Sequence, residues 1–259
     1  MSNQPETSST SILERPPIVF EQIRQEPWKL TPASFPVLSE NGPGREQFRR
    51  LGTNLRNLRS DKPFKSILVT SSRKGEGKSF MASNLALNLA LHDASRVLII
   101  DGDHRNPTLH RLLGATQEPG LTEYLSGCAD TKDILRRVAV DDQAPESAPE
   151  RAFGSIAFVP AGGGLNRLPR EKRSLAGLLA EVGDVFDWII LDSPPALAVS
   201  DALDFAPAVD GILLVMQSGK VPSEEACLTA NAFSGRRILG CVLNQSEINN
   251  SSYYYYGSE

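Results

Sequence analysis

Residues 65–79 read Lys-Ser-Ile-Leu-Val-Thr-Ser-Ser-Arg-Lys-Gly-Glu-Gly-Lys-Ser, and the architecture of the chain follows from them. Residues 65–71 are an apolar run typical of a buried strand, and residues 72–79 match a phosphate-binding loop of the Walker A type. The pattern after the loop predicts an amphipathic helix that continues to about Leu91. Its apolar face comprises Met81, Leu85 and Leu89, with Leu87 and Leu91 beside them. Strand, loop and helix in this order predict a nucleotide-binding site.

The residue types in the loop fit phosphate chemistry. Glycines let backbone N–H groups turn toward phosphate oxygens, and the start of the next helix adds a positive dipole end. Lys78 can reach the β and γ phosphates, and the Ser79 hydroxyl can ligate magnesium. Ser72 stands where the motif has its first glycine. We therefore expect ATP and Mg²⁺ as cofactors, with nucleotide contacts from Ser72, Lys74, Gly75, Glu76, Gly77, Lys78, Ser79 and Phe80.

Carboxylates follow two further apolar runs. Residues 96–100 lead into Asp101 and Asp103, and residues 186–191 lead into Asp192. Because parallel strands deliver their carboxyl ends to one edge of a sheet, we expect these aspartates near the phosphates. They can hold magnesium there, and Asp101 or Asp103 can accept the proton of an attacking hydroxyl. A single aspartate after a strand often only caps the next helix, but three of them beside a Walker A loop favour catalysis.

A run of tyrosines lies near the carboxyl end of the chain. It contains four of the five tyrosines, Tyr253, Tyr254, Tyr255 and Tyr256, among Asn, Ser and Gly residues. Tyrosine is usually half buried with its hydroxyl paired, and this polar tail offers nothing to bury it. The run therefore suggests that the hydroxyls themselves are a substrate.

Together these motifs resemble the bacterial tyrosine kinases, cytoplasmic autokinases that partner membrane proteins controlling polysaccharide chain length. That family combines a Walker A loop, an apolar motif followed by Asp-x-Asp-x-Arg, a Walker B strand ending in Asp and a carboxyl-terminal tyrosine cluster. The corresponding segments here are residues 72–79, 97–105, 189–192 and 253–256. The resemblance extends from about Gly44 to the end of the chain.

The resemblance implies an α/β fold of the deviant Walker A P-loop NTPase type. It also implies ATP-dependent autophosphorylation of the tyrosine cluster in the control of exopolysaccharide or capsule synthesis and export. The implied catalytic residues are Lys78, Asp101, Asp103 and Asp192, with magnesium held by Ser79 and the three aspartates. Arg105 is a motif position that can hold the acidic loop or contact a neighbouring subunit. Asn244 resembles a position from which related ATPases touch the adenine base.

Partners are implied by the same resemblance: a membrane polysaccharide copolymerase acting as activator, further copies of the chain, and a cognate tyrosine phosphatase. The expected location is cytoplasmic, peripheral at the inner face of the plasma membrane through that partner. The family's oligomer motif, Glu-x-x-Arg-x-x-Arg, matches at Glu46 and Arg49. Gly52 replaces the second arginine, which leaves the family's ring-shaped octamer open.

Composition bounds the other possibilities. The chain has 259 residues, 40% of them hydrophobic, which fits one large domain. Its net charge of −4 argues against general nucleic-acid binding. No apolar run reaches the roughly 18 residues that span a bilayer. The three cysteines form neither a disulfide framework nor a zinc pattern, and Cys241 is expected in the core.

The chain divides into three parts. Residues 1–41 are rich in Ser, Thr, Pro and Glu and are expected to form a disordered arm. Residues 42–248 form the predicted kinase domain, and residues 249–259 form a flexible tail. Further strands at residues 211–216 and 238–243 alternate with helical segments, which predicts a mostly parallel sheet with helices on both faces.

Two other functions stay open. A partitioning-type ATPase of the same deviant group would hydrolyse ATP to water; such proteins carry a lysine where this chain has Arg73, with Lys74 one step later, and lack a tyrosine tail. A kinase-inactive, nucleotide-dependent regulator of a copolymerase is the other, although the intact Lys78 and aspartates disfavour it. Neither alternative predicts phosphotyrosine in the tail.

Overall fold

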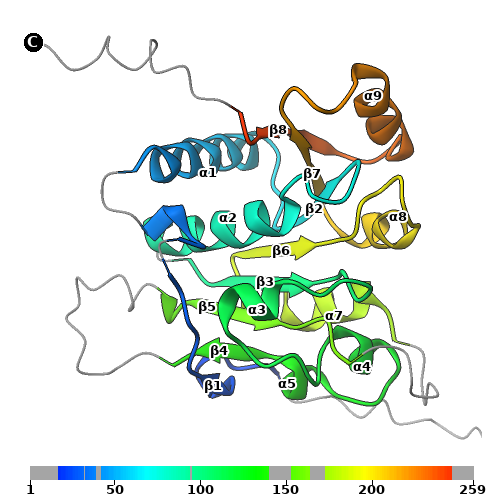
Figure 1. Cartoon of the computed structure of the whole chain (residues 1–259). Coiled ribbons are helices and arrows are strands. Elements are labelled where there is room, and N and C mark those ends of the chain that lie inside the picture. The colour runs from blue at the N-terminus through cyan, green and yellow to red at the C-terminus, as the bar shows by residue number, and fades with distance from the viewer. Residues whose placement is uncertain are drawn as a thin grey trace, which may run out of the picture.

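An eight-stranded sheet forms the centre of the computed structural model, which describes residues 17–31, 33–38, 42–93, 95–139, 153–163 and 173–246 (Figure 1). The strand order is β1-β4-β5-β3-β6-β2-β7-β8. The strands are β1 (Gln25–Glu26), β2 (Ser66–Ser71), β3 (Val97–Asp101), β4 (Arg136–Val138), β5 (Ile156–Val159), β6 (Trp188–Asp192), β7 (Gly211–Gln217) and β8 (Ile238–Asn244). Only β4 and β5 pair antiparallel, so the predicted mostly parallel sheet is confirmed.

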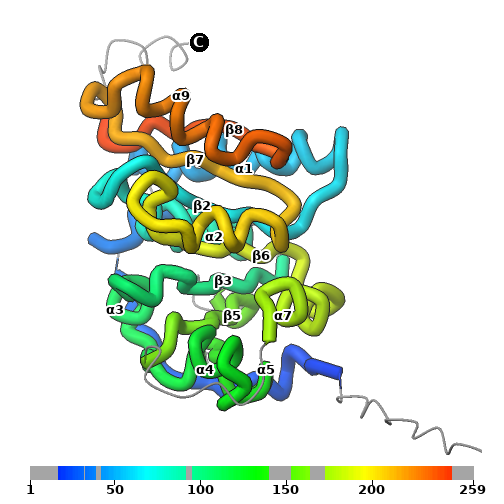
Figure 2. Tube along the Cα trace, turned by 90° about the vertical axis from the view of Figure 1, so that its right-hand side faces the viewer, coloured from blue at the N-terminus to red at the C-terminus, as the bar shows by residue number. Residues whose placement is uncertain are grey.

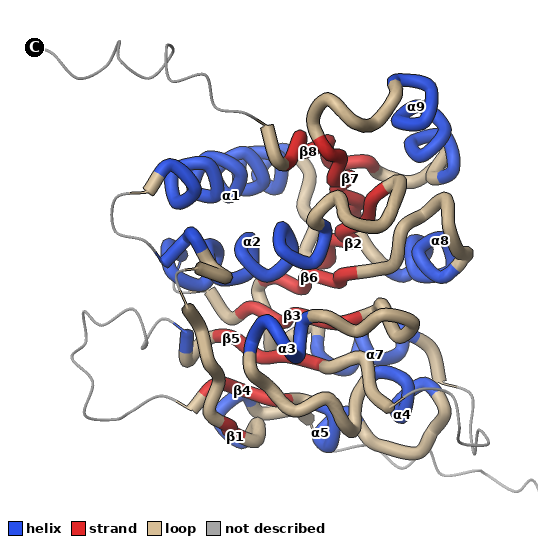
Figure 3. The backbone as a smooth tube through the Cα atoms, in the orientation of Figure 1, coloured by secondary structure: helices blue, strands red, loops and turns tan. Residues whose placement is uncertain are grey.

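Helices cover both faces of this sheet, as Figures 2 and 3 show from two directions. The α-helices are α1 (Pro43–Asp61), α2 (Lys78–Asp93), α3 (Leu109–Leu113), α4 (Leu121–Leu125), α5 (Thr131–Ile134), α7 (Leu175–Val182), α8 (Asp201–Phe205) and α9 (Ser223–Ala232). The 3₁₀ helices are η1 (Phe20–Gln22), η2 (Pro36–Leu38) and η3 (Ala206–Ala208). Within the described ranges, no helix combines the length and the apolar character that a membrane span requires.

The central strands separate two apolar cores. On β2, Ile67 and Val69 face the core that contains residues of α1 and α2, while Leu68 faces the core that contains residues of α7 and α8. Every residue of β2, β3, β5 and β6 is buried, because both faces of these strands are covered. Polar side chains can therefore reach the surface only where these strands end.

Helix α2 differs from its prediction, because it is buried all round rather than on one apolar face. Its polar residues Asn84 and Asn88 are both 0% exposed. Helix α1 packs over the side of α2 that was expected to meet solvent. Gly52 permits the close approach, since a Cβ atom at this position would lie 2.5 Å from Oδ1 of Asn88. The amphipathic pattern alone did not reveal this second layer.

The prediction of a disordered arm over residues 1–41 was wrong for its described part. Phe20 and Ile23 enter one apolar core, and Phe35 and Val37 enter the other, so the arm passes from one face of the sheet to the other. Its short strand β1 pairs parallel with β4. The aromatic and aliphatic side chains are too sparse to show periodicity, yet they bury well. Residues 1–16 lie outside the described residues.

A buried polar network fixes the arm to the sheet. Arg136 is 0% exposed, and its Nε lies 3.8 Å from Oε2 of Glu26 on β1. The same carboxylate accepts hydrogen bonds from the backbone N–H of Thr116 (3.1 Å) and from its hydroxyl (2.7 Å). Because an unpaired buried charge is strongly destabilising, each partner depends on the other.

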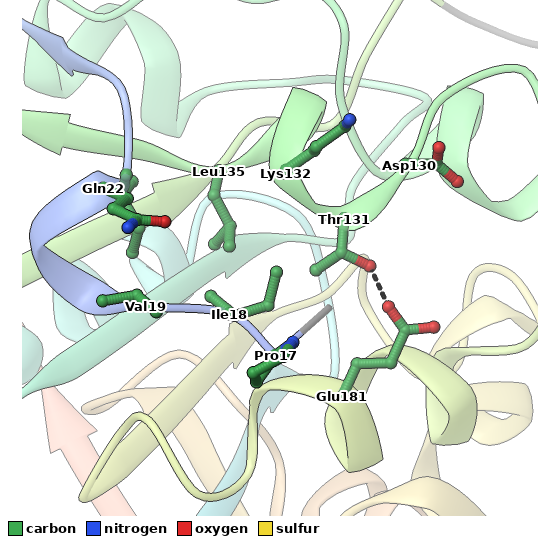
Figure 4. A pocket seen from close by; sticks show the side chains of 10 residues that line it. Pro17, Ile18, Val19, Gln22, Asp130, Thr131, Lys132, Leu135 and Glu181 are labelled. Carbon is green, nitrogen blue, oxygen red and sulfur yellow. Dashed lines mark hydrogen bonds between the residues drawn. The ribbon is translucent and has the colours of Figure 1, made fainter. Parts of the chain in front are cut away.

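A cavity of about 400 Å³ lies between the arm, α5 and α7 (Figure 4). Ile18 and Leu135 line it with apolar groups, and the Thr131 hydroxyl donates a hydrogen bond to Glu181 at its edge. None of the lining residues comes from the Walker A loop or from the acidic strand ends. The cavity is therefore separate from the predicted site.

Gly52→Val should destabilise the fold by about 2 kcal/mol, because overpacking against buried Asn88 outweighs the small gain in helix propensity. Urea denaturation would measure the change, and Thr53→Val on the exposed neighbouring position is the matched control. An unchanged or higher stability for Gly52→Val would contradict the close approach of α1 and α2.

Candidate active site

The Walker A loop connects β2 to α2 in a conformation that requires glycine. Gly75 and Gly77 both have φ of +90°, a region that other residues rarely adopt. The backbone N–H of Arg73 donates to Oε2 of Glu76 at 2.8 Å, which closes the loop on itself. A side chain at Gly77 would overlap the amide nitrogen of Asn244. The loop shape is thus fixed by local sequence and by β8.

The predicted acidic residues meet at the carboxyl edge of the central strands. Asp101 on β3 lies opposite Asp192 on β6 in the strand register. Nζ of Lys78, at the start of α2, lies 3.3 Å from Oδ2 of Asp103. These four residues and Ser79 are buried, with exposed fractions of 9% or less. Strand order and the helix start therefore assemble one charged cluster from three separate segments.

Asp101 also has the capping role that the simpler interpretation assigned to such aspartates. Its Oδ2 accepts the backbone N–H of Thr108 (3.2 Å) and of Leu109 (3.1 Å), at the start of α3. Its Oδ1 accepts the backbone N–H of Asp103 at 3.1 Å. Both oxygens of Asp101 are thus engaged by backbone donors, which fixes the turn that carries Asp103.

Asp192, unlike Asp101, has no backbone donors at its carboxyl oxygens in the described part of the chain. It is 0% exposed, and neither of its carboxyl oxygens meets a hydrogen-bond partner within the described residues. Burial raises the pKa of Asp192 to about 8, although nearby Lys78 and, more weakly, the Ser79 hydroxyl, which lies outside ideal hydrogen-bond geometry, oppose this shift. Burial likewise raises the pKa of Asp101 to about 6, against the lowering effect of its backbone donors. An orphaned, buried carboxylate of this kind is suited to receive a cation.

Two residues that sequence reasoning did not find support the site from neighbouring loops. Asp201, at the start of α8, accepts a hydrogen bond from Nε of Arg105 at 3.1 Å and lies 3.3 Å from Nε2 of His104. This pairing ties the loop after β3 to the segment after β6, and it favours the role of Arg105 in holding the acidic loop over a contact with a neighbouring subunit. On α9, Thr229 lies at hydrogen-bond distance from Ser72. Because both contacts join segments that are far apart in sequence, no local sequence pattern predicts them.

The other predicted positions fall around this cluster. Asn244 ends β8, and its Nδ2 donates to the carbonyl oxygen of Glu76 at 2.8 Å, so it supports the loop whatever its contact with adenine. The ring of Phe80 packs against Phe48 of α1, with centroids 5.9 Å apart. Lys74 is exposed on the loop.

Three predictions away from the cluster have different outcomes. Glu46 and Arg49 form an exposed ion pair of 2.9 Å on α1. Cys241 is exposed, because β8 is the outermost strand, so its prediction as a core residue was wrong. Tyr253, Tyr254, Tyr255 and Tyr256 lie outside the described residues.

Comparison with known proteins agrees with this geometry. The family model described as AAA domain matches residues 64–224. Tyrosine-protein kinase YwqD from Bacillus subtilis (strain 168) is 32% identical over 217 residues, which cover 83% of this chain and 86% of YwqD. The chain belongs to the bacterial tyrosine kinase family. The protein is thus a tyrosine kinase, which transfers phosphoryl groups from ATP to tyrosine.

Further relatives of the kinase agree. The solved kinase domain of Escherichia coli tyrosine kinase ETK has a TM-score of 0.65 and 27% identity, covering 82% of the kinase and 80% of that chain. The succinoglycan biosynthesis transport protein ExoP from Rhizobium meliloti (strain 1021) is 30% identical over 195 residues. That match covers 73% of the kinase and 23% of ExoP. The predicted P-loop fold and nucleotide binding are confirmed, whereas the individual residue roles stay predictions.

Replacing Asp192 with Asn should change how the stability of the kinase depends on pH. The folded-state pKa of Asp192 is raised from 3.8 to about 8, so the parent loses stability as pH rises through that window. The amide cannot ionise. The stability of Asp192→Asn relative to the parent should therefore be greater at pH 8 than at pH 5 by more than about 1 kcal/mol.

Urea denaturation without nucleotide or magnesium measures this difference. Asp204→Asn, which removes an exposed carboxylate from α8, is the control and should stay within about 0.5 kcal/mol of the parent. A stability difference for Asp192→Asn that does not vary between the two pH values would contradict the raised pKa.

Proposed function

We propose that the kinase transfers the γ-phosphoryl group of ATP to its own tyrosine cluster, Tyr253 to Tyr256, and thereby regulates exopolysaccharide or capsule synthesis and export. The observation that carries this proposal is the placement of Lys78, Asp103 and Asp192 at one sheet edge beside the Walker A loop. The tyrosine-rich end of the sequence supplies the acceptor hydroxyls that such a site needs.

Lys78 and Asp103 have linked roles in this mechanism. Lys78 pairs with Asp103 at 3.3 Å in the present structure, and the phosphates of ATP compete for the same ammonium group. When Lys78 turns to the phosphates, Oδ2 of Asp103 becomes available to accept or orient the tyrosine proton. Asp101 is less suited to that task, because backbone donors engage both of its oxygens.

The donors for magnesium fit the ion. Ser79 offers a hydroxyl, and Asp192 offers two carboxyl oxygens that lack hydrogen-bond partners among the described residues. No three acidic, His or Cys side chains converge into a complete cage within those residues, and Mg²⁺ does not require one, because substrate phosphates fill its shell. Bound there, Mg²⁺ would offset the negative charge of the phosphates, with Asp101 and Asp103 close by.

The partners follow from the relatives and the family resemblance. ExoP is named a transport protein of succinoglycan biosynthesis, and the kinase matches 23% of its length. We accordingly assign the kinase a membrane polysaccharide copolymerase as activator, which would hold it at the inner face of the plasma membrane. A cognate tyrosine phosphatase would reset the tail. Further copies of the kinase would meet at the α1 surface with Glu46 and Arg49.

Mass spectrometry of the terminal peptide tests the proposal after co-expression with the copolymerase activator. Phosphate should be present on Tyr253 to Tyr256 in the parent, and it should fall by at least about 100-fold in Lys78→Met, because a Walker A lysine stabilises the charge of the transferred group. Lys132→Met, which changes an exposed lysine on α5, should retain parental phosphorylation. An unmodified tail in an ATP-bound, activator-bound parent would refute the tail as substrate.

A further inference from the structure

The first residue of the Walker A loop is held by a helix from the other end of the domain. Ser72 occupies the position of the first motif glycine and is 1% exposed. Its Oγ lies 2.8 Å from Oγ1 of Thr229, which is 0% exposed on α9. The two residues are 157 positions apart in sequence. A glycine at position 72 could not make this contact.

The contact between Ser72 and Thr229 is a hydrogen bond between two buried hydroxyls. Oγ1 of Thr229 lies 2.8 Å from Oγ of Ser72 and 2.8 Å from the carbonyl oxygen of Glu225, which can only accept. The Thr229 hydroxyl has one proton and donates it to one of these two oxygens. With either choice the hydroxyls of Ser72 and Thr229 are paired with each other, so α9 engages the hydroxyl of Ser72.

A second contact reaches the next residue of the loop. Arg73 forms an ion pair with Glu225, whose side chain is 14% exposed. Glu225 and Thr229 are four residues apart on α9, so they lie on the same face of the helix. Two adjacent loop residues are thus held by two side chains one helical turn apart.

The residue that contacts Ser72 occupies the buried position of helix α9. Thr229 is the buried residue of the helix, while Leu228 beside it is 60% exposed. An apolar residue would fill a buried helical position without requiring a hydrogen-bond partner, and threonine has a weaker helix propensity than leucine or alanine. The hydroxyl of Thr229 therefore has a role beyond filling space.

We infer that α9 positions the nucleotide-binding loop, and that Thr229 is a positioning residue that acts through Ser72. The bond fixes the start of the loop, whose following N–H groups must face the phosphates. The inference requires only that the loop binds nucleotide. Evidence against the tyrosine tail as substrate would therefore leave this inference unaffected.

A double-mutant cycle tests the inference with a fluorescent ATP analogue and Mg²⁺. Thr229→Val keeps the shape but removes the hydroxyl, and it should weaken nucleotide binding about fivefold. Thr229→Ser, which keeps the hydroxyl, should remain within about twofold of the parent. In a Ser72→Ala background, Thr229→Val should cause no further loss, because the bond is already absent.

Steady-state kinetics and a surface control separate positioning from general instability. Thr229→Val should raise KM for ATP about fivefold, with kcat within about twofold of the parent. Asn231→Ala changes an exposed side chain on α9 that does not line the pocket beside Ser72, and it should leave binding unchanged. Equal losses of affinity in the Ser72 and Ser72→Ala backgrounds would overturn the inference. A lower Tm for Thr229→Val with unchanged affinity would also overturn it.

Discussion

Burial of the central strands on both faces is the constraint on which the rest of this structure depends. Strands β2, β3 and β6 have no exposed residue, so polar and charged groups can appear only where these strands end. Parallel pairing then brings Asp101 and Asp192 opposite each other, and the loop after β2 delivers Lys78 to the same edge. The active site is therefore a direct consequence of how the sheet is covered.

Burying several charged groups together away from water is energetically unfavourable, and the fold compensates the three aspartates to different degrees. Asp101 receives three backbone donors and Asp103 receives the ammonium group of Lys78, whereas Asp192 receives no hydrogen bond within the described residues. Desolvation accordingly raises the pKa of Asp192 more than that of Asp101. The cluster is thus satisfied around the turn that carries Asp103 and left incomplete at Asp192, the residue proposed to hold magnesium.

Features carried by neighbouring residues could be predicted from sequence, and those carried by distant contacts could not. The strand, loop and helix at residues 66–93 and the acidic strand ends follow from short-range patterns, so their meeting was foreseen. The burial of Phe20 and Phe35, by contrast, depends on surfaces built from the rest of the chain. Helix α2 appeared amphipathic because its cover, α1, is a separate element. Contacts such as Ser72 with Thr229 join segments that no window of sequence contains.

The arm also determines how a mechanical load on the amino-terminal side of the kinase would travel. A pull on residues before Pro17 first reaches η1, where Glu21 pairs with Arg96 at 2.7 Å and Phe20 packs against Phe186. It then reaches β1, whose pairing with β4 is supported by the Arg137 N–H bond to the Arg24 carbonyl (2.8 Å) and the Ala139 N–H bond to the Glu26 carbonyl (2.8 Å). Strands β4 and β5 stand between that edge and β3. The contacts of η1 and β1 lie at the start of β3 and at the outer edge of the sheet, so tension would load them before the carboxyl edge of β3, which carries Asp101.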